Sequence, residues 1–496
     1  MSTQAQTGAG LKKWGIFITT LIASITVIMN NSLQEVAVPL YIEIFQIPTL
    51  NAQWIVSLFS LTFLISLTIA PYLAKKFGYR NVFFFGLILL TTGAIIGGFA
   101  PAFNVMLLAR VFQGAGGGLI MPICLVILRE GFGHEQQGFA MGLWSFSGMI
   151  AQAFGPTIGG IILENSSWNY LFFANIPVVI FCLIATIVFV KGNIGKIDGA
   201  ITFDWIGFIL ISVGLVSLVF AIEQIQKANN VLIPAALFIV AVICLTTFVF
   251  HSLRAKEPII NIRIMKNSLF TASLIITICC AFTMTSLVFI IPLLMQQVLN
   301  VGPTLSGLAA LPHAVMVGVF GIVGGKLLDR YGAKSAVYPG LFILLGVSLF
   351  FYFSLNSIPI WAIIVCIVLI GIGNGMLSTT TVATALSNLK QDQLGEGSSM
   401  VNISKHLGKV IIVVVVAFIL DSRRTQYLAE NYETSAAIVA SIQDVYLFLA
   451  GFLVLMIPVV WLICKKYNEK SGVAKNEGTL AKEETLVKEE ETQLQS

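Results

Sequence analysis

The sequence predicts an all-α polytopic membrane protein with fourteen transmembrane helices. Of its 496 residues, 57% are hydrophobic and 10% are charged, whereas soluble domains carry about 25% charged residues. The mean hydropathy is +0.93. Apolar runs of about 20 residues, the length that spans a bilayer, recur along the chain. Helices satisfy their own backbone hydrogen bonds in lipid, so a helical bundle follows.

Six spans are expected in the first part of the chain, after a polar segment at 1–13. They lie at 14–38, 53–73, 82–100, 104–127, 138–162 and 170–190. The first is predicted to be retained, because its apolar stretch is longer than that of a signal peptide and no small-residue cleavage site follows it.

Eight further spans complete the count. Two lie at 204–223 and 231–250, with Asp204 expected to cap the first of them. Six more are expected at 269–294, 304–325, 336–354, 360–386, 401–420 and 444–464. The remaining tail is rich in Lys and Glu, a composition typical of a solvated, disordered segment.

The distribution of Lys and Arg predicts the orientation of the spans. With the N-terminus inside, the outer loops hold only Lys227, Arg423 and Arg424, and the other connections hold many more basic residues. Basic residues favour the cytosolic side, so both termini are predicted to lie in the cytosol of a cell with this protein in its plasma membrane. The formal net charge of +5 then reflects topology, and no nucleic-acid partner is expected.

Several kinds of chemistry find no support in the sequence. The seven cysteines and four histidines form no metal-ligand or CxxC spacing, so no metal, cofactor or disulfide framework is expected. We find no pair of a nucleophile and a base and no phosphate-binding loop. An enzyme and a transporter driven by ATP are therefore both disfavoured.

Two sequence motifs occur twice, at nearly the same offset. The turn LAKKFGYR (73–80) resembles LLDRYGAK (327–334), which places Gly78 and Gly332 254 residues apart. The run GAGGGL (114–119) shares its GxGxG spacing with GIGNGM (371–376) at an offset of 257. Two six-helix repeats with a two-helix insert are predicted, an arrangement typical of secondary transporters. The expected boundaries are 1–13, 14–190, 191–268, 269–464 and 465–496.

With these motifs, the chain resembles the major facilitator superfamily in its fourteen-span drug:proton antiporter branch. The resemblance runs from Trp14 to about Lys466. Four stretches carry it: the turn 73–80 with its copy at 324–334, Arg110–Gln113–Gly114, GPTIGG at 155–160, and WNYLFFANIP at 168–177. It implies two halves that rock around a substrate site, and an antiporter motif on the fifth span formed by Gly148, Gly155, Pro156, Gly159 and Gly160.

The turns at 73–80 and 327–334 are candidates for a cytosolic gate. Its expected members are Lys75, Gly78, Arg80, Asp329, Arg330 and Gly332. Asp329 is expected to bind helix N-termini and Arg330. The family's loop usually has Asp where this chain has Lys75, so the second turn is predicted to be the stronger latch.

Arg110 is a charge inside an apolar span, where membrane insertion penalises it by roughly 2.5–3.5 kcal/mol. Glu35 is the acidic residue inside the spans of the first half. Both lie roughly 8–9 Å below the outer surface at 1.5 Å per residue, so a pair is predicted. Either the pair is a structural tether, or protonation of Glu35 acts as a switch. Asn31 shares its helix face, and the family's usual first-span Asp is replaced by Asn30.

Candidates for the substrate cavity combine apolar and amide side chains. They are Gln113, Trp144, Met149, Gln152, Phe289 and Gln296. Core packing is the alternative interpretation for each. Lys405, His406 and Lys409 open the thirteenth span and are expected to reach the cytosolic headgroups.

The function predicted from these features is proton-coupled efflux of hydrophobic or amphipathic compounds by alternating access. One alternative is a dedicated exporter or importer of a single metabolite. Another is a membrane sensor or assembly partner that transports nothing. The expected partners are a small-molecule substrate, protons and the lipid bilayer, and a monomer is compatible with the sequence.

Overall fold

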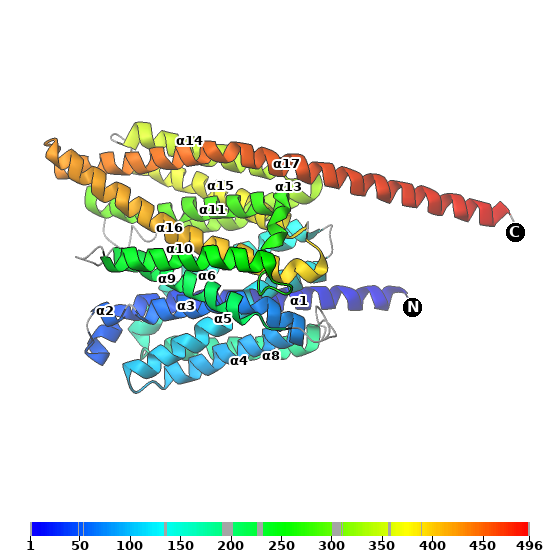
Figure 1. Ribbon diagram of the computed structural model, residues 1–496, viewed down its shortest axis with the longest axis horizontal. Coiled ribbons are helices and arrows are strands. Elements are labelled where there is room, and N and C mark those ends of the chain that lie inside the picture. Colours follow the sequence, from blue (N-terminus) through cyan, green and yellow to red (C-terminus); the bar gives the residue numbers. More distant parts are fainter. Residues whose placement is uncertain are drawn as a thin grey trace.

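A computed structural model describes residues 2–47, 49–52, 54–132, 136–190, 202–225, 232–299, 309, 311–355, 359–387 and 389–494. These residues are almost entirely helical, and none of them forms a strand. The helices run side by side in a bundle, and both chain termini leave it at the same end (Figure 1). We call this the terminal end, and the other the opposite end.

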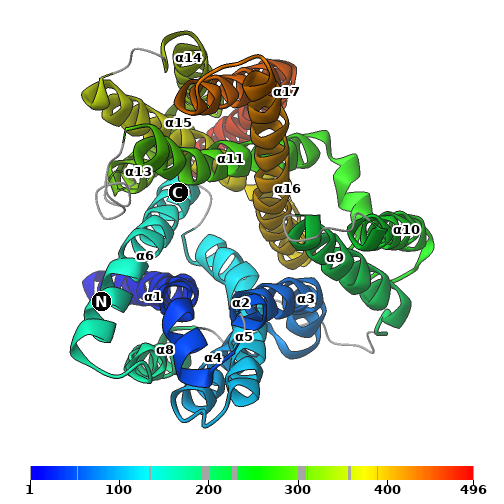
Figure 2. The same cartoon turned by 90° about the vertical axis from the view of Figure 1, so that its left-hand side faces the viewer.

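Two groups of helices and an insert make up the bundle (Figure 2). The N-terminal group comprises α1 (Ser2–Phe45), α2 (Thr49–Ala52), α3 (Trp54–Phe77), α4 (Tyr79–Gly98), α5 (Phe103–Phe132), α6 (Gln137–Asn165), α7 (Tyr170–Phe173) and α8 (Asn175–Phe189). The insert comprises α9 (Trp205–Ile225) and α10 (Leu232–Arg254). We call the surface along which the N-terminal and C-terminal groups meet the seam.

The C-terminal group follows a short 3-10 helix, η2 (Ile262–Lys266). It comprises α11 (Ser268–Leu293), the π-helical turn η3 (Leu294–Val298), α13 (Leu311–Tyr331), α14 (Lys334–Ser354), α15 (Ile360–Ser387), the 3-10 turn η5 (Gln391–Gln393), α16 (Leu394–Ala429) and α17 (Thr434–Leu494). The polar tail, predicted to be disordered, instead continues α17 beyond the bundle (Figure 1). Its many Glu, Lys and Ala residues are strong helix formers, which accounts for the difference.

The prediction of an all-α polytopic membrane protein is confirmed. Among the described residues, twelve helices are long and apolar enough to cross a membrane, and Trp205–Ala221 of α9 is a shorter apolar helix. The predicted number of fourteen spans stays a prediction.

Repeated glycines make repeated contacts between helices. A Cβ on Gly116 of α5 would lie 2.5 Å from the carbonyl oxygen of Gly86 on α4, and a Cβ on Gly373 of α15 would lie 2.9 Å from that of Gly340 on α14. Small residues at such crossings let two backbones approach closely. The GxGxG runs therefore pack their helices in the same way in both groups.

The two glycine turns also match in conformation. Gly78 has φ 84° and Gly332 has φ 81°, a left-handed region that side chains with a Cβ rarely adopt. Each glycine separates two consecutive helices at the terminal end. The tight reversals that the sequence predicts are thus present at both positions.

One carboxylate connects the two helices of the insert. Asp204 accepts a hydrogen bond of 2.8 Å from the backbone N–H of Gly207, which confirms the predicted cap of α9. The same carboxylate lies 2.7 Å from Nε2 of His251 near the end of α10.

Candidate functional site

Arg110 is fully buried on α5 and is surrounded by hydrogen-bond acceptors. Its guanidinium donates to the carbonyl oxygen of Ile55 at 2.7 Å, to Oε1 of Gln113 at 2.9 Å and to Oδ1 of Asn31 at 2.8 Å. The ring of Phe59 lies 4.5 Å from its Cζ atom. Charge-assisted hydrogen bonds of this kind offset the desolvation of a buried cation.

Amide side chains extend this cluster across the N-terminal group. Gln113 Nε2 and Asn175 Nδ2 both donate to Oδ1 of Asn30, at 3.1 and 3.0 Å. Asn30 therefore acts as an acceptor between α5 and α8 at the position where the resembled family has Asp. Gln113 is fully buried in this cluster, and its place in a substrate cavity stays a prediction.

The side chain of Glu35, the predicted partner of Arg110, is not among those that the structure describes. The backbone of Glu35 belongs to α1, but its side chain lies outside the described residues. The same holds for the side chains of Pro156, Phe289 and Gln296. The pair of Glu35 with Arg110 stays a prediction, and the position of Asn31 beside the guanidinium agrees with it.

Aromatic rings connect the Arg110 cluster to the C-terminal group. Phe59, in contact with the guanidinium, stacks on Phe63 one turn further along α3 at 5.9 Å between centroids. The ring of Phe63 lies 4.8 Å from that of His406 on α16. A movement of Arg110 would therefore displace aromatic rings that contact α16 across the seam.

The glycines of the predicted antiporter motif pack mainly against α1. A Cβ on Gly155 would lie 2.5 Å from Cβ of Ser32, and one on Gly159 would lie 3.4 Å from Leu33. Gly148 approaches Ile28 of the same helix at 3.2 Å, and Gly160 has nothing within 4 Å. These glycines thus contact a helix of their own group, and their role as an antiporter motif stays a prediction.

Other glycines of α6 make the contact with α13 across the seam. A Cβ on Gly142 would lie 2.5 Å from the carbonyl oxygen of Gly321. One turn earlier, Gly138 meets the backbone of Gly325. Both pairs bring backbone against backbone, so a side chain at either position would push the two groups apart.

We predict that Gly142→Ala slows transport strongly and that Gly160→Ala leaves it unchanged. The first substitution places a methyl group against an immobile carbonyl, and overpacking of this kind costs about 1–3 kcal/mol. The second places it in open space. Transport rate and melting temperature of the two purified variants measure the difference. Equal effects of both substitutions would contradict this assignment of the seam.

Asp329 forms a contact between the groups at the terminal end. Its two carboxylate oxygens accept hydrogen bonds from the backbone N–H groups of Gly138 and Phe139, each at 3.0 Å, at the start of α6. A carboxylate at a helix N-terminus is favoured by the helix dipole. The expected contact with the start of a helix is present, whereas Arg330 lies over the ring of Tyr331.

Lys75 forms a second such contact, with a partner that is far away in the sequence. Its ammonium makes an ion pair with the carboxylate of Glu396 in the first turn of α16. The other oxygen of Glu396 accepts a hydrogen bond of 3.2 Å from the backbone N–H of Asn261. That the second turn is the stronger latch stays a prediction, and the acid that pairs with Lys75 lies on the facing helix. Arg80 instead binds the carbonyl oxygen of Ile187, at 2.9 Å.

Further bonds close the terminal end of the seam. Ser398 donates to the carbonyl oxygen of Pro122, and Arg129 donates to those of Ser387 and Leu389 at 3.3 Å each. Further along α6, towards the opposite end, Gln152 is exposed. Of the other cavity candidates, Trp144 is buried and Met149 is half-buried.

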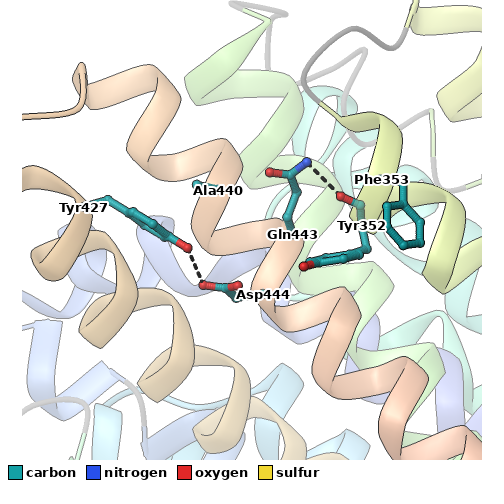
Figure 3. Close-up of a pocket in the computed structure, with 6 residues that line it drawn as sticks. All are labelled: Tyr352, Phe353, Tyr427, Ala440, Gln443 and Asp444. Carbon is teal, nitrogen blue, oxygen red and sulfur yellow. Dashed lines mark hydrogen bonds between the residues drawn. The ribbon is translucent and has the colours of Figure 1, made fainter. Parts of the chain in front are cut away.

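A small pocket lies at the opposite end of the C-terminal group (Figure 3). It has a volume of about 290 Å³ and is lined by Tyr352, Phe353, Tyr427, Ala440, Gln443 and Asp444. Asp444 accepts a hydrogen bond of 2.9 Å from the hydroxyl of Tyr427 and lies 3.0 Å from Nε of Arg423. Gln443 Nε2 also donates to the carbonyl oxygen of Tyr352 at 2.8 Å, so residues of α14, α16 and α17 meet at this pocket.

Comparison with known families and proteins gives a consistent result. The family described as Major Facilitator Superfamily matches residues 20–413 and 273–488. Lincomycin resistance protein LmrB of Listeria monocytogenes serovar 1/2a (strain ATCC BAA-679 / EGD-e) is 26% identical over 481 residues, which cover 95% of this chain and 100% of that protein. Riboflavin transporter RibZ of Clostridioides difficile (strain 630) is 24% identical over 437 residues, which cover 88% of this chain and 94% of that protein.

Among solved structures, the chain resembles the proton:xylose symporter XylE bound to 6-bromo-6-deoxy-D-glucose. The TM-score is 0.61 at 10% sequence identity, with 90% of this chain and 95% of that chain covered. A likeness at this identity concerns the fold alone.

Proposed function

The chain belongs to the major facilitator superfamily and is a multi-pass membrane transporter, and from this premise we propose that it exports hydrophobic or amphipathic compounds in exchange for protons. We assign the terminal end to the cytosol and the membrane to the plasma membrane. The excess of Lys and Arg in the connections at that end supports the assignment.

The observation that carries the proposal is the set of polar contacts across the seam. Asp329 and Lys75 each connect the terminal turn of one group to the start of a helix in the other. Both contacts are small and polar, so they are readily broken and remade. A seam held in this way suits a transporter that alternates between a state closed to the cytosol and a state open to it.

Proton coupling is assigned to Glu35 and the Arg110 cluster. Protonation of Glu35 would remove a negative charge from the surroundings of a guanidinium that cannot lose its own proton. The bonds of Arg110 to Ile55 and Asn31 would then redistribute between α3 and α1. The aromatic contacts from Phe59 to His406 provide a physical route to α16.

Two relatives suggest different substrate ranges. The similarity to a lincomycin resistance protein favours efflux of drug-like amphipaths. The similarity to a riboflavin transporter favours the second candidate, a transporter for one metabolite. A panel of unrelated amphipaths distinguishes them, because a dedicated transporter would move one compound and its close analogues.

We predict that proteoliposomes move amphipathic compounds against a gradient when a proton gradient is imposed, and that Glu35→Gln loses this pH dependence. Glu43→Gln is the matched control, because Glu43 is exposed and lies eight residues further along the same helix, near its C-terminal end. The measurement is the initial transport rate at several imposed pH differences. Normal uphill transport with unchanged pH dependence in Glu35→Gln would exclude Glu35 as the coupling site. Failure of every compound to exchange with protons would reject antiport.

A further inference from the structure

Lys405 lies at the seam, where its ammonium faces α6. It is eleven residues from the start of α16, or roughly 16 Å along the helix at 1.5 Å per residue. Its ammonium lies over the ring of Trp144 on α6, 5.4 Å from the ring centroid. Lys405 and Trp144 thus face each other from the two groups.

Trp144 contributes a second donor at this place. Its side chain is 5% exposed, and the buried Nε1 atom has no hydrogen-bond partner among the described residues. A buried polar group without a partner is costly, and such groups usually find one. An ammonium and an indole N–H side by side both require an acceptor.

Lys405 is half-buried, and three other cations enclosed between helices have oxygen partners. Arg110 binds three acceptors, Arg129 binds two carbonyl groups and Lys75 binds a carboxylate. Lys405 differs, because the ring of Trp144 is its partner within the described part of the chain. A cation–π contact offsets only part of the cost of taking an ammonium out of water.

The titratable residues of α16 near Lys405 are basic. On α16, Lys405, His406 and Lys409 are the titratable residues between Glu396 and Asp421. The neighbouring helices α3, α11 and α15 contain no Asp or Glu at all. The acids of α5 and α6, Glu130 and Glu164, lie within two residues of a helix end. An organic cation would therefore meet like charge at this position.

We propose that Lys405 and Trp144 form the site that binds the charged group of the substrate, and that this substrate is an amphipathic organic anion. A carboxylate or sulfonate accepts hydrogen bonds from the ammonium and from the indole N–H. The flexible stem of Lys405 lets the ammonium move from the ring face to the ring edge, where the N–H points. This inference rests on the proposed export of amphipaths and narrows it to one charge class.

The test is equilibrium binding to the full-length protein in nanodiscs, without any gradient. The probes share one apolar body: 2-naphthylacetate, its neutral amide, and (2-naphthylmethyl)trimethylammonium. We expect the acid to bind about tenfold more tightly than the amide, as hydrogen bonds to charged groups contribute at least that factor, and the cation to bind most weakly. Lys405→Gln should abolish the preference for acid over amide, and Lys405→Arg should retain it.

Two control variants separate recognition from folding. Trp144→Phe keeps the ring but removes the N–H, and should weaken binding of the acid without weakening that of the amide. Lys326→Gln removes another lysine that lies over an aromatic ring, that of Phe139, at the terminal end, and should change nothing. Tighter binding of the cation, no binding of the acid, or an acid preference that survives Lys405→Gln would overturn the inference.

Transport in proteoliposomes keeps this inference distinct from the proposed function. If the acid binds selectively but none of the three probes moves under a proton gradient, antiport is rejected and the anion site stands. If transport is driven by protons but shows no preference for the acid in binding or in rate, the anion site is rejected and antiport stands.

Discussion

Lys75→Met will open the terminal end of the seam, and the double variant Lys75→Met with Glu396→Gln will restore much of its closure. Glu396 is 4% exposed at its side chain and Lys75 is 27% exposed. Removing the ammonium leaves a buried carboxylate without its cation, which costs about 2 kcal/mol once the partial exposure of Lys75 is allowed for. Removing both charges avoids this cost.

The pH dependence of this effect has a definite sign. Burial raises the pKa of Glu396, and the neighbouring Lys75 lowers it only in part. A raised pKa in the closed state means that this state binds the proton more tightly than an open state with an exposed carboxyl. Acidification therefore favours closure at this contact. In Lys75→Met the pKa rises further, so the opening will be largest above that pKa and will disappear as the pH falls through it.

Two measurements check the effect of Lys75. One is maleimide labelling of Ser398→Cys, which lies against α5 at Pro122 in the closed seam. The other is the melting temperature of the purified protein between pH 5 and pH 8. Lys76→Met is the control, because Lys76 is adjacent and exposed. If Lys75→Met labels no faster than Lys76→Met, or if the double variant labels faster than the single one, the ion pair does not hold the seam.

Arg110→Ile will abolish transport and destabilise the N-terminal group by about 3–5 kcal/mol. The substitution leaves the acceptors on Ile55, Gln113 and Asn31 without their donor in a buried place. Arg110→Lys will also fail to transport, because a single ammonium cannot reproduce a planar fork that reaches three acceptors.

Ile367 provides the matched control for Arg110. It occupies the equivalent position of the second repeat, beside the same GxGxG glycines, and is fully buried. Ile367→Leu conserves volume and should cost less than about 1.5 kcal/mol. Chemical denaturation and proton-driven transport measure both quantities. Wild-type transport in Arg110→Lys would show that the fork geometry has no part in the mechanism.

The sequence was sufficient for the fold class and for the repeated glycine motifs inside each group. Apolar runs of membrane length predict helices, because no other structure satisfies the backbone in lipid. The GxGxG runs and the turns at Gly78 and Gly332 predicted two repeats, and the two groups have matching close contacts and turn conformations at these glycines. Such features depend on residues that are close together in the sequence, or on a repeat that can be recognised in the sequence itself.

The sequence also singled out Arg110, since a charge in an apolar helix demands partners. It did not identify Asn30 and Asn175 as members of the same cluster. Neutral amides cost less in a membrane than charges do, so their positions in the sequence carry a weaker signal. Asn30 stood out only as the place where an expected acid is missing.

Only the tertiary structure decided which residues meet across the seam. Lys75 and Glu396 are separated by 321 positions, and Lys405 and Trp144 are on helices from different groups. Helical periodicity shows which side chains share a face, but not which face of another helix lies opposite. The chain itself therefore determined the helices, the repeat and the buried charge. The packing of one group against the other determined the latch at Glu396 and the pairing of Lys405 with Trp144.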